Sequence, residues 1–240
     1  MSSPAPRRGH HGMPPPPMTG EIEILGEKCL QYVLQHATKG DAQSVVDAID
    51  AFGYETWMMN VGDEKGAIVD AEIAKAKPQV MVEIGAFCGY SAVRFASKLL
   101  AESGPSARYY SFEFSPHFAN IASQMVEFAG LSDVVTFVIG PFSETYTKLK
   151  ELGITHVDMF FIDHDKQQYT SDFKLIEHSG LLTPGSVVVA DNVIAASPDK
   201  QFDYLDYVRS NPKFTSVLHE SFLEYQAEMK DGVEVTTYVG

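Results

Sequence analysis

Short apolar runs alternate with amphipathic segments along this 240-residue chain, and this alternation constrains the fold more than any other feature. The runs are rich in Val, Ile and Phe, and we expect them to be strands at 81–85 (with Val80 before it), 109–114, 134–140, 157–163 and 186–192. Helical spacing of apolar residues marks the segments 22–37, 41–52, 62–77, 91–100, 116–129, 143–152 and 168–179. Nearly continuous apolar strands separated by such helices are typical of a parallel sheet covered on both faces.

The C-terminal stretch has a different pattern. Residues 216–229 and 233–240 flank Lys230-Asp231-Gly232, and an Asp-Gly pair is a strong signal for a hairpin turn. We therefore predict an α/β fold whose doubly wound, mostly parallel, seven-stranded sheet ends in a C-terminal antiparallel hairpin. Residues 21–240 should form a single domain, because no linker or internal repeat divides them.

Composition excludes several classes of function. The net charge of -14, from 18 Lys and Arg against 32 Asp and Glu, argues against a nucleic-acid partner. Cys29 and Cys88 are too few for a disulfide framework, and no apolar run reaches the ~20 residues of a membrane helix. We expect a cytoplasmic protein without a membrane partner. Residues 1–20 should be a disordered Pro-rich tail, with contact to a protein partner through Pro14–Pro17 as the alternative.

The ends of the first two strands carry a glycine turn and an acid. In a parallel sheet, ligands bind beyond the carboxyl ends of the strands. Gly85 and Gly89 allow a sharp turn and a close backbone approach to a ligand, although such a turn also closes an ordinary strand–helix corner. Glu113 ends the next strand, where a carboxylate accepts hydrogen bonds from ribose hydroxyls or simply faces solvent. Together they indicate a nucleoside-containing ligand.

Two later strand ends carry oxygen ligands. Asp163 ends one strand, and Asp191-Asn192 ends the next. Carboxylate and carboxamide oxygens suit a hard divalent ion such as Mg²⁺, whereas helix capping is the alternative role. Lys166 follows Asp163 by three residues. Near a bound cation its ammonium form is disfavoured, so it becomes a candidate base, with a solvated lysine as the alternative.

Seven segments together resemble the catechol O-methyltransferase family. They are WMMNVGDEKG at 57–66, VEIGAFCGYSAVR at 82–94, FEFSP at 112–116, FAGL at 128–131, FIDHDK at 161–166, VVVADNVI at 187–194 and FLEY at 222–225. They occur in the family's order over about residues 25–240. The resemblance implies a Rossmann-like methyltransferase fold and Mg²⁺-dependent methyl transfer from S-adenosylmethionine to one hydroxyl of a catechol.

The resemblance also implies a role for particular residues. The metal ligands would be Asp163, Asp191 and Asn192. The catalytic residues would be Lys166 as general base, Glu224 on the second hydroxyl, and Asn192. The cofactor would contact Met59, Val61, Glu83, Gly85, Ser91, Glu113, Phe114, Gly140, Phe142, Ser143 and Asp163. The catechol would contact Trp57, Met59, Asn60, Lys166, Asn192 and Glu224.

The sequence departs from the family pattern at the adenine and at the ring pocket. Asp165 stands where the family often has Trp, and Phe142-Ser143 replaces Ser-Gln. Residues 195–197 replace a segment that usually holds a Pro. Two alternatives to catechol methylation remain open: a metal-dependent O-methyltransferase acting on larger phenylpropanoid esters, and a non-catalytic binding protein that retains the fold.

Overall fold

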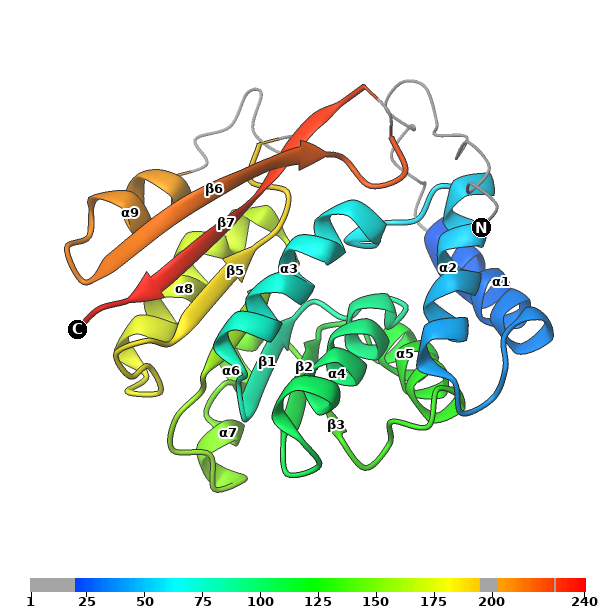
Figure 1. Cartoon of the computed structure of the whole chain (residues 1–240), viewed down its shortest axis with the longest axis horizontal. Helices are drawn as coiled ribbons and strands as arrows, with labels where there is room; N and C mark the ends of the chain where they lie inside the picture. Colours follow the sequence, from blue (N-terminus) through cyan, green and yellow to red (C-terminus); the bar gives the residue numbers. More distant parts are fainter. Residues whose placement is uncertain (1–19, 195–202, 227) are drawn as a thin grey trace.

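A seven-stranded sheet forms the centre of the computed structural model, which describes residues 20–194, 203–226 and 228–240. The strands are β1 (Val80–Ile84), β2 (Arg108–Glu113), β3 (Val135–Ile139), β4 (Met159–Ile162), β5 (Val187–Ala190), β6 (Phe214–Phe222) and β7 (Lys230–Tyr238). Their order is β3-β2-β1-β4-β5-β7-β6 (Figure 1). Strands β1 to β5 pair in parallel, and β7 runs antiparallel to both β5 and β6. The predicted doubly wound sheet with a C-terminal antiparallel hairpin is confirmed.

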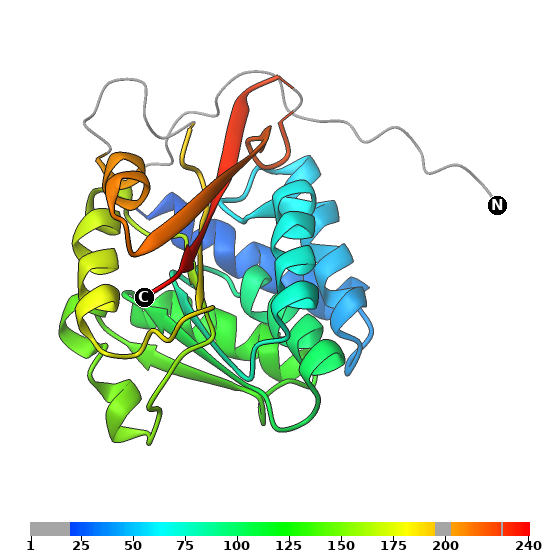
Figure 2. The ribbon, with the colours of Figure 1, turned by 60° about the vertical axis from the view of Figure 1, so that its left-hand side comes forward.

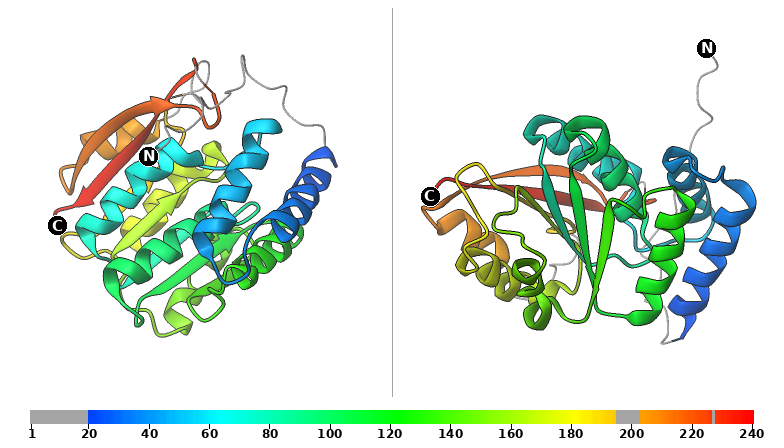
Figure 3. Two further views of the ribbon diagram at one scale, coloured as in Figure 1. Left: turned by 45° about the vertical axis from the view of Figure 1, so that its right-hand side comes forward. Right: turned by 90° about the horizontal axis from the view of Figure 1, so that it is seen from below.

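Helices cover both faces of the sheet (Figure 3). One face is covered by α1 (Glu21–His36), α2 (Ala42–Glu55), α3 (Gly62–Ala76), α4 (Tyr90–Ser103) and α5 (Pro116–Phe128). The other is covered by α6 (Phe142–Thr145), α7 (Lys148–Glu151), α8 (Tyr169–His178), which a 3₁₀ turn (Lys166–Gln168) precedes, and α9 (Tyr204–Ser210). Because each face has its own hydrophobic core, strands β1, β4 and β5 are buried on both sides. This explains their nearly continuous apolar sequences.

Local signals set several of the helix boundaries. Gly40 adopts a left-handed backbone (φ 82°) between α1 and α2, and the Asp41 carboxylate then caps α2 by accepting from Ser44 N–H at 3.1 Å. Ser115 caps α5, and Pro116 occupies its first turn, where the missing N–H costs nothing. Two features were not predicted: the segment 143–152 is divided into α6 and α7, and α9 follows residue 203.

The hairpin forms, but the prediction that its turn lies at Lys230-Asp231-Gly232 is wrong. These residues are the first three of β7, where Asp231 pairs with Ser221 and Gly232 with Glu220 (Figure 2). The reversal lies between Phe222 and Lys230. Gly232 lies in a crowded position, because a Cβ there would approach the side chains of Ile194 and Leu218 to 3.0 Å. Tertiary contacts therefore override the local turn signal.

The fold brings the predicted site to one edge of the sheet. The carboxyl ends of β1, β2, β4 and β5 lie side by side because these strands are parallel. Among the described residues, no helix is long and apolar enough to cross a membrane. Cys29 and Cys88 are both buried free thiols. The predicted tail lies outside the described residues except for Gly20.

Candidate active site

Two residues at the end of β4 are joined directly. Lys166 Nζ donates to Asp163 Oδ1 at 2.8 Å and lies 2.5 Å from the Tyr169 hydroxyl. That hydroxyl is within hydrogen-bonding distance of the main-chain carbonyls of Ile162 (3.1 Å) and Asp191 (3.0 Å). Tyr169 thus links the ends of β4 and β5. About a quarter of the Lys166 side chain is exposed, so this lysine lies at the solvent-accessible side of the cluster.

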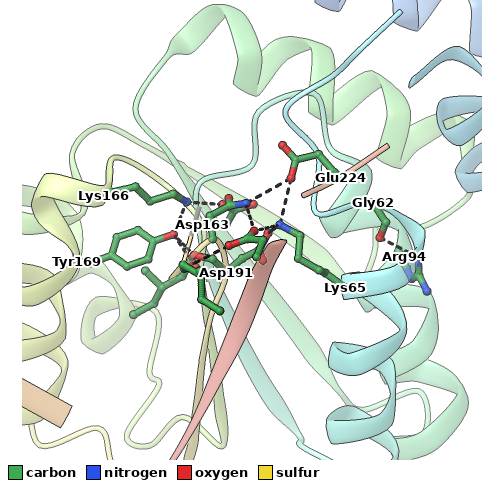
Figure 4. A network of polar contacts seen from close by, with 12 residues as sticks. Gly62, Lys65, Arg94, Asp163, Lys166, Tyr169, Asp191 and Glu224 are labelled. Atoms are coloured by element: carbon green, nitrogen blue, oxygen red, sulfur yellow. Dashed lines mark hydrogen bonds and ion pairs between the residues drawn. The ribbon is translucent and has the colours of Figure 1, made fainter. Parts of the chain in front are cut away.

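A buried lysine binds three carboxylates beneath this point. Lys65 Nζ lies 2.9 Å from Asp191 Oδ2, 3.1 Å from Glu224 Oε2 and 2.7 Å from Asp231 Oδ2. Figure 4 shows Lys65 approaching from α3, while Lys166 and Tyr169 approach from the opposite side. Neither Lys65 nor Asp231 was predicted from the sequence as a site residue. A signal for Lys65 existed, because it lies on the buried stripe of α3 with Gly62, Gly66 and Val69.

The end of β5 presents one oxygen from each of two residues. Lys65 holds Asp191 Oδ2, whereas Asp191 Oδ1 is buried and has no hydrogen-bond partner among the described residues. Asn192 adopts a left-handed backbone (φ 52°), and its Nδ2 donates to Asp231 Oδ2 at 2.7 Å and to Glu224 Oε2 at 3.3 Å. Since carboxylates only accept, the amide nitrogen must face them and Oδ1 points elsewhere.

The cluster carries an excess of negative charge. Four carboxylates (Asp163, Asp191, Glu224 and Asp231) face two ammonium groups, which leaves a formal charge of minus two. Burial raises the pKa of Asp191 to about 8 against the opposing effect of Lys65, with Asp163 also raising it. Burial also raises the pKa of Glu224. Burial alone would lower the pKa of Lys65, but the carboxylates around it raise it overall. The site therefore favours an additional cation.

The residues present fit a hard divalent ion. The described residues contain no group of three or more His, Cys, Asp or Glu side chains arranged as metal ligands, so an ion held by Asp163 and Asp191 would take a further protein ligand of another type, such as the Asn192 amide. Asp191 Oδ1, Asn192 Oδ1 and the Asp163 carboxylate are all oxygen donors, which suits Mg²⁺ better than a soft metal. An unpartnered buried carboxylate oxygen is costly unless such a ligand satisfies it.

The glycine turn after β1 is held by Glu113. Its carboxylate accepts from the N–H groups of Ala86 (3.0 Å), Phe87 (2.9 Å) and Ser115 (2.8 Å). These bonds use three of about four acceptor positions on a carboxylate, so about one remains for a ligand hydroxyl. Gly85 has φ 101°, and a Cβ there would lie 2.3 Å from the Asp163 carbonyl oxygen. The close backbone approach at Gly85 is therefore to the end of β4.

A buried acid lies below this turn. Glu83 is fully buried, and Ser111 donates to its Oε2 at 2.5 Å. Burial raises the pKa of Glu83 to about 7, against the opposing effect of hydrogen bonds from Ser111, Ser91 and Tyr109. The structure thus brings Glu83 together with Ser91, the first-turn residue of α4 that was predicted to contact the same ligand.

The segment before α3 faces Glu224. Asn60 is buried and donates to the Tyr225 hydroxyl at 3.2 Å. A Cβ at Gly62 would meet the Glu224 Cβ at 3.0 Å, so the start of α3 packs closely on the segment after β6. The Arg94 guanidinium donates to the Gly62 carbonyl at 3.3 Å and fixes this approach (Figure 4).

The remaining predicted residues have different degrees of exposure. Met59 is 40% exposed, Trp57 is half-buried and Val61 is buried. Around the predicted adenine position, Phe114 and Ser143 are exposed, whereas Phe142 packs on Phe112 in the core. Gly140 adopts φ 125°. Asp165 is exposed, and its carboxylate accepts from Gln167 N–H. The predicted departure at 195–197 lies outside the described residues. None of these placements tests a ligand contact.

Comparison with known proteins agrees with the geometry. The family model described as a methyltransferase domain matches residues 82–193. Catechol O-methyltransferase of Bos taurus is 46% identical over 216 residues, which cover 89% of this chain and 76% of the relative. A probable O-methyltransferase of Mycobacterium tuberculosis is 37% identical, over 92% of this chain and 96% of that protein.

Solved structures support the fold independently. The O-methyltransferase TomG of Streptomyces achromogenes superposes with a TM-score of 0.69 at 21% identity, covering 92% of this chain and 99% of that one. The methyltransferase PaMTH1 of Podospora anserina superposes with a TM-score of 0.66 at 19% identity, covering 96% and 100%. These distant structures confirm the Rossmann-like architecture. The identity and coverage shared with the bovine enzyme go further: this chain belongs to the catechol O-methyltransferase family.

Proposed function

We propose that this protein transfers a methyl group from S-adenosylmethionine to one hydroxyl of a catechol, with a divalent cation such as Mg²⁺ bound at the ends of β4 and β5. The observation that carries the proposal is the meeting of Asp163, Lys166, Asp191, Asn192 and Glu224 in one cluster that has a formal deficit of two positive charges. A non-catalytic protein of this fold would have no need to keep such a cluster, because unbalanced buried charge is destabilising.

The cation would be held by Asp191 Oδ1, Asn192 Oδ1 and the Asp163 carboxylate. When bound, a divalent cation acts as a Lewis acid that favours ionisation of a chelated phenol and orients the ring. Two vicinal hydroxyls are then preferred over one, because both oxygens can chelate.

Lys166 in its neutral form would take the proton of the attacking hydroxyl at Nζ, after it has lost its own ammonium proton to solvent, which a nearby bound cation favours. In the structure this nitrogen is 2.8 Å from Asp163, at the end of β4 and beside the proposed metal ligands. Glu224 would accept a hydrogen bond from the second hydroxyl and hold the ring in register. As the oxygen–carbon bond forms, the carbon–sulfur bond breaks and the sulfur leaves as a neutral thioether. Alignment of the three atoms is the main contribution of such positioning residues.

Glu83 and Glu113 would place the methyl donor, whose sulfonium carries the electrophilic carbon. Glu83 and Ser91 would contact its methionine part below the glycine turn, and Glu113 would contact its ribose. Three neutral main-chain donors already orient the Glu113 carboxylate, so little ordering cost remains when a ribose hydroxyl binds.

The test is a methyl-transfer assay with catechol, S-adenosylmethionine and Mg²⁺, with methylated product detected by mass spectrometry. We expect one methyl group per catechol, and loss of turnover when EDTA exceeds the metal. Equal rates with and without EDTA would refute the metal role. Binding of S-adenosylmethionine without transfer to any vicinal diphenol would refute the enzymatic proposal and favour the binding-protein alternative.

A second comparison separates the two enzymatic alternatives. The assay is repeated with a phenylpropanoid ester that carries the same vicinal hydroxyls. A higher kcat/KM for catechol supports the proposal, whereas a preference for the bulky ester supports the other class of metal-dependent O-methyltransferase. A cytoplasmic location stays a prediction from the sequence.

A further inference from the structure

Two buried residues of the cluster have no part in the proposed chemistry. Lys65 and Asp231 are both fully buried, and Lys65 Nζ lies 2.7 Å from Asp231 Oδ2. Neither side chain is accessible to solvent, so neither is a candidate to touch a substrate. Both contact residues that have a proposed role in the site: Lys65 binds Asp191 and Glu224, and Asp231 binds Asn192. These contacts show how Lys65 and Asp231 orient the side chains of Asp191 and Asn192.

The contacts of Lys65 with Asp191 and of Asp231 with Asn192 each use an atom that is not needed to bind a cation. Lys65 occupies Asp191 Oδ2 and leaves Oδ1 without a partner in the part of the chain that the structure describes. Asp231 accepts from Asn192 Nδ2 at 2.7 Å, which turns Asn192 Oδ1 away from the protein acceptors. If the Asn192 amide were rotated by half a turn, its oxygen would face two carboxylates, a repulsive arrangement. Both oxygens at the end of β5 are thereby selected before any ligand binds.

The chain after β5 is held at the same point. Asp231 Oδ1 accepts from Ile194 N–H at 3.3 Å, and the Gly232 carbonyl accepts from Val193 N–H at 3.2 Å. The start of β7 thus fixes both the side chain of Asn192 and the main chain that follows it. The left-handed conformation of Asn192 (φ 52°) is rare for a residue other than glycine and needs such support.

We propose that Lys65 and Asp231 are a buried positioning pair that preselects Asp191 Oδ1 and Asn192 Oδ1 as ligands of a divalent cation. This inference rests on the proposed function and adds the residues that prepare its metal site. Partners behind a metal ligand commonly change metal affinity 10- to 100-fold when they are replaced.

The experiment measures Mn²⁺ affinity by electron paramagnetic resonance, without any methyl donor or catechol. Two substitutions change the local charge in opposite directions: Asp231→Asn removes a negative charge, and Lys65→Met removes a positive one. If charge alone mattered, Lys65→Met would strengthen Mn²⁺ binding. If positioning matters, both variants should weaken it by about 10- to 100-fold.

Glu234→Gln is the matched control. Glu234 is fully buried on the same strand as Asp231, and Arg209 binds it with two contacts of 2.7 Å. Among the described residues, no side-chain hydrogen bond or ion pair joins Glu234 to the proposed metal ligands. We expect this variant to lose thermal stability and to keep wild-type Mn²⁺ affinity. An equal loss of affinity in the control and in Asp231→Asn would overturn the proposal, because the effect would then be general destabilisation.

The outcomes also separate this inference from the proposed function. If the wild-type chain fails to bind Mn²⁺, the metal part of the proposed function fails. If it binds Mn²⁺ and Lys65→Met binds equally or more tightly, only the positioning pair is refuted. If a variant does not fold, NMR on the wild-type chain provides the test by measuring solvent exchange of the Asn192 side-chain NH₂. Slow exchange supports the positioning pair, and exchange as fast as in a free asparagine refutes it.

Discussion

Glu83 offers a test that links burial, pH and ligand binding. Its carboxyl is fully buried on β1, and burial raises its pKa to about 7 from a reference value of 4.5. Replacement of Glu83 by Gln keeps the size of the side chain and an oxygen that accepts from Ser111, but it removes the ionisation. The difference between the wild-type chain and this variant therefore isolates the cost of burying the charge.

The sign follows from proton binding. Between pH 4.5 and 7 the folded chain binds more protons at Glu83 than the unfolded chain does, so the free energy of unfolding falls as pH rises. Below pH 4.5 the carboxyl is protonated in both states and costs nothing, and above pH 7 the penalty is complete. The shift corresponds to roughly 3 kcal/mol in total, of which about 2 kcal/mol develops between pH 5.5 and 8.

The assay is urea unfolding of the wild-type chain and Glu83→Gln at pH 5.5, 6.5, 7.5 and 8. We expect the stability of the variant relative to wild type to increase by about 2 kcal/mol across this range. Glu151→Gln, at an exposed residue of α7, is the control and should show no such trend. A difference between wild type and Glu83→Gln that does not change with pH would refute the reasoning.

The same titration should appear in ligand binding. If Glu83 contacts the ammonium group of S-adenosylmethionine, the ligand binds the ionised carboxylate more tightly. Its affinity should then rise from pH 5.5 to 7.5, by at most tenfold per pH unit, and level off near the pKa of the free chain. In Glu83→Gln the affinity should be lower and independent of pH in this range. Calorimetry measures both effects.

Three further substitutions test separate parts of the site. Lys166→Ala should lower kcat by roughly 10²-fold or more, while the affinity for S-adenosylmethionine, measured by calorimetry, stays unchanged. Lys174→Ala on α8 is the control. An unchanged kcat in Lys166→Ala would remove Lys166 from the mechanism. Glu113→Gln should weaken S-adenosylmethionine binding about tenfold in the same assay, because a neutral amide loses charge-assisted bonds; wild-type affinity would contradict this. Gly85→Ala should reduce the free energy of unfolding by about 2 kcal/mol or more, because of its positive φ and its approach to the Asp163 carbonyl; wild-type urea unfolding would contradict it.

The strand ends were predictable because two rules coincide there. An apolar run that ends in a polar residue marks the edge of a buried strand, and parallel strands end at the same edge of the sheet. Asp163 and Asp191 were therefore placed together from the sequence, and in the structure Lys166 and Tyr169 connect the Asp163 carboxylate to the Asp191 carbonyl. The roles assigned through the family resemblance, such as those of Glu83 and Phe142, remain predictions of ligand contact.

Lys65 and Asp231 show why the rest was missed. Lys65 lies on the apolar stripe of its helix, where a lysine is normally assigned to solvent unless a buried partner is known. Its partner Asp231 is 166 residues away and carries a local turn signal that predicted a different role. Neither residue can be interpreted without the other. Pairs of this kind require the tertiary structure because each residue alone favours the wrong environment.

The charges of the site suggest how folding and metal binding are kept separate. With no buried lysine, four carboxylates would face only Lys166, and the fold itself would depend on the metal, as it does in small zinc domains. A further fixed ammonium group would reduce the deficit from two charges to one and compete with the metal. Lys65 lies between these extremes, since it satisfies three carboxylates at 2.7–3.1 Å and still leaves Asp191 Oδ1 without a partner among the described residues. One permanent cation thus offsets part of the buried negative charge, and the remaining deficit would provide the affinity for the exchangeable cation that we propose.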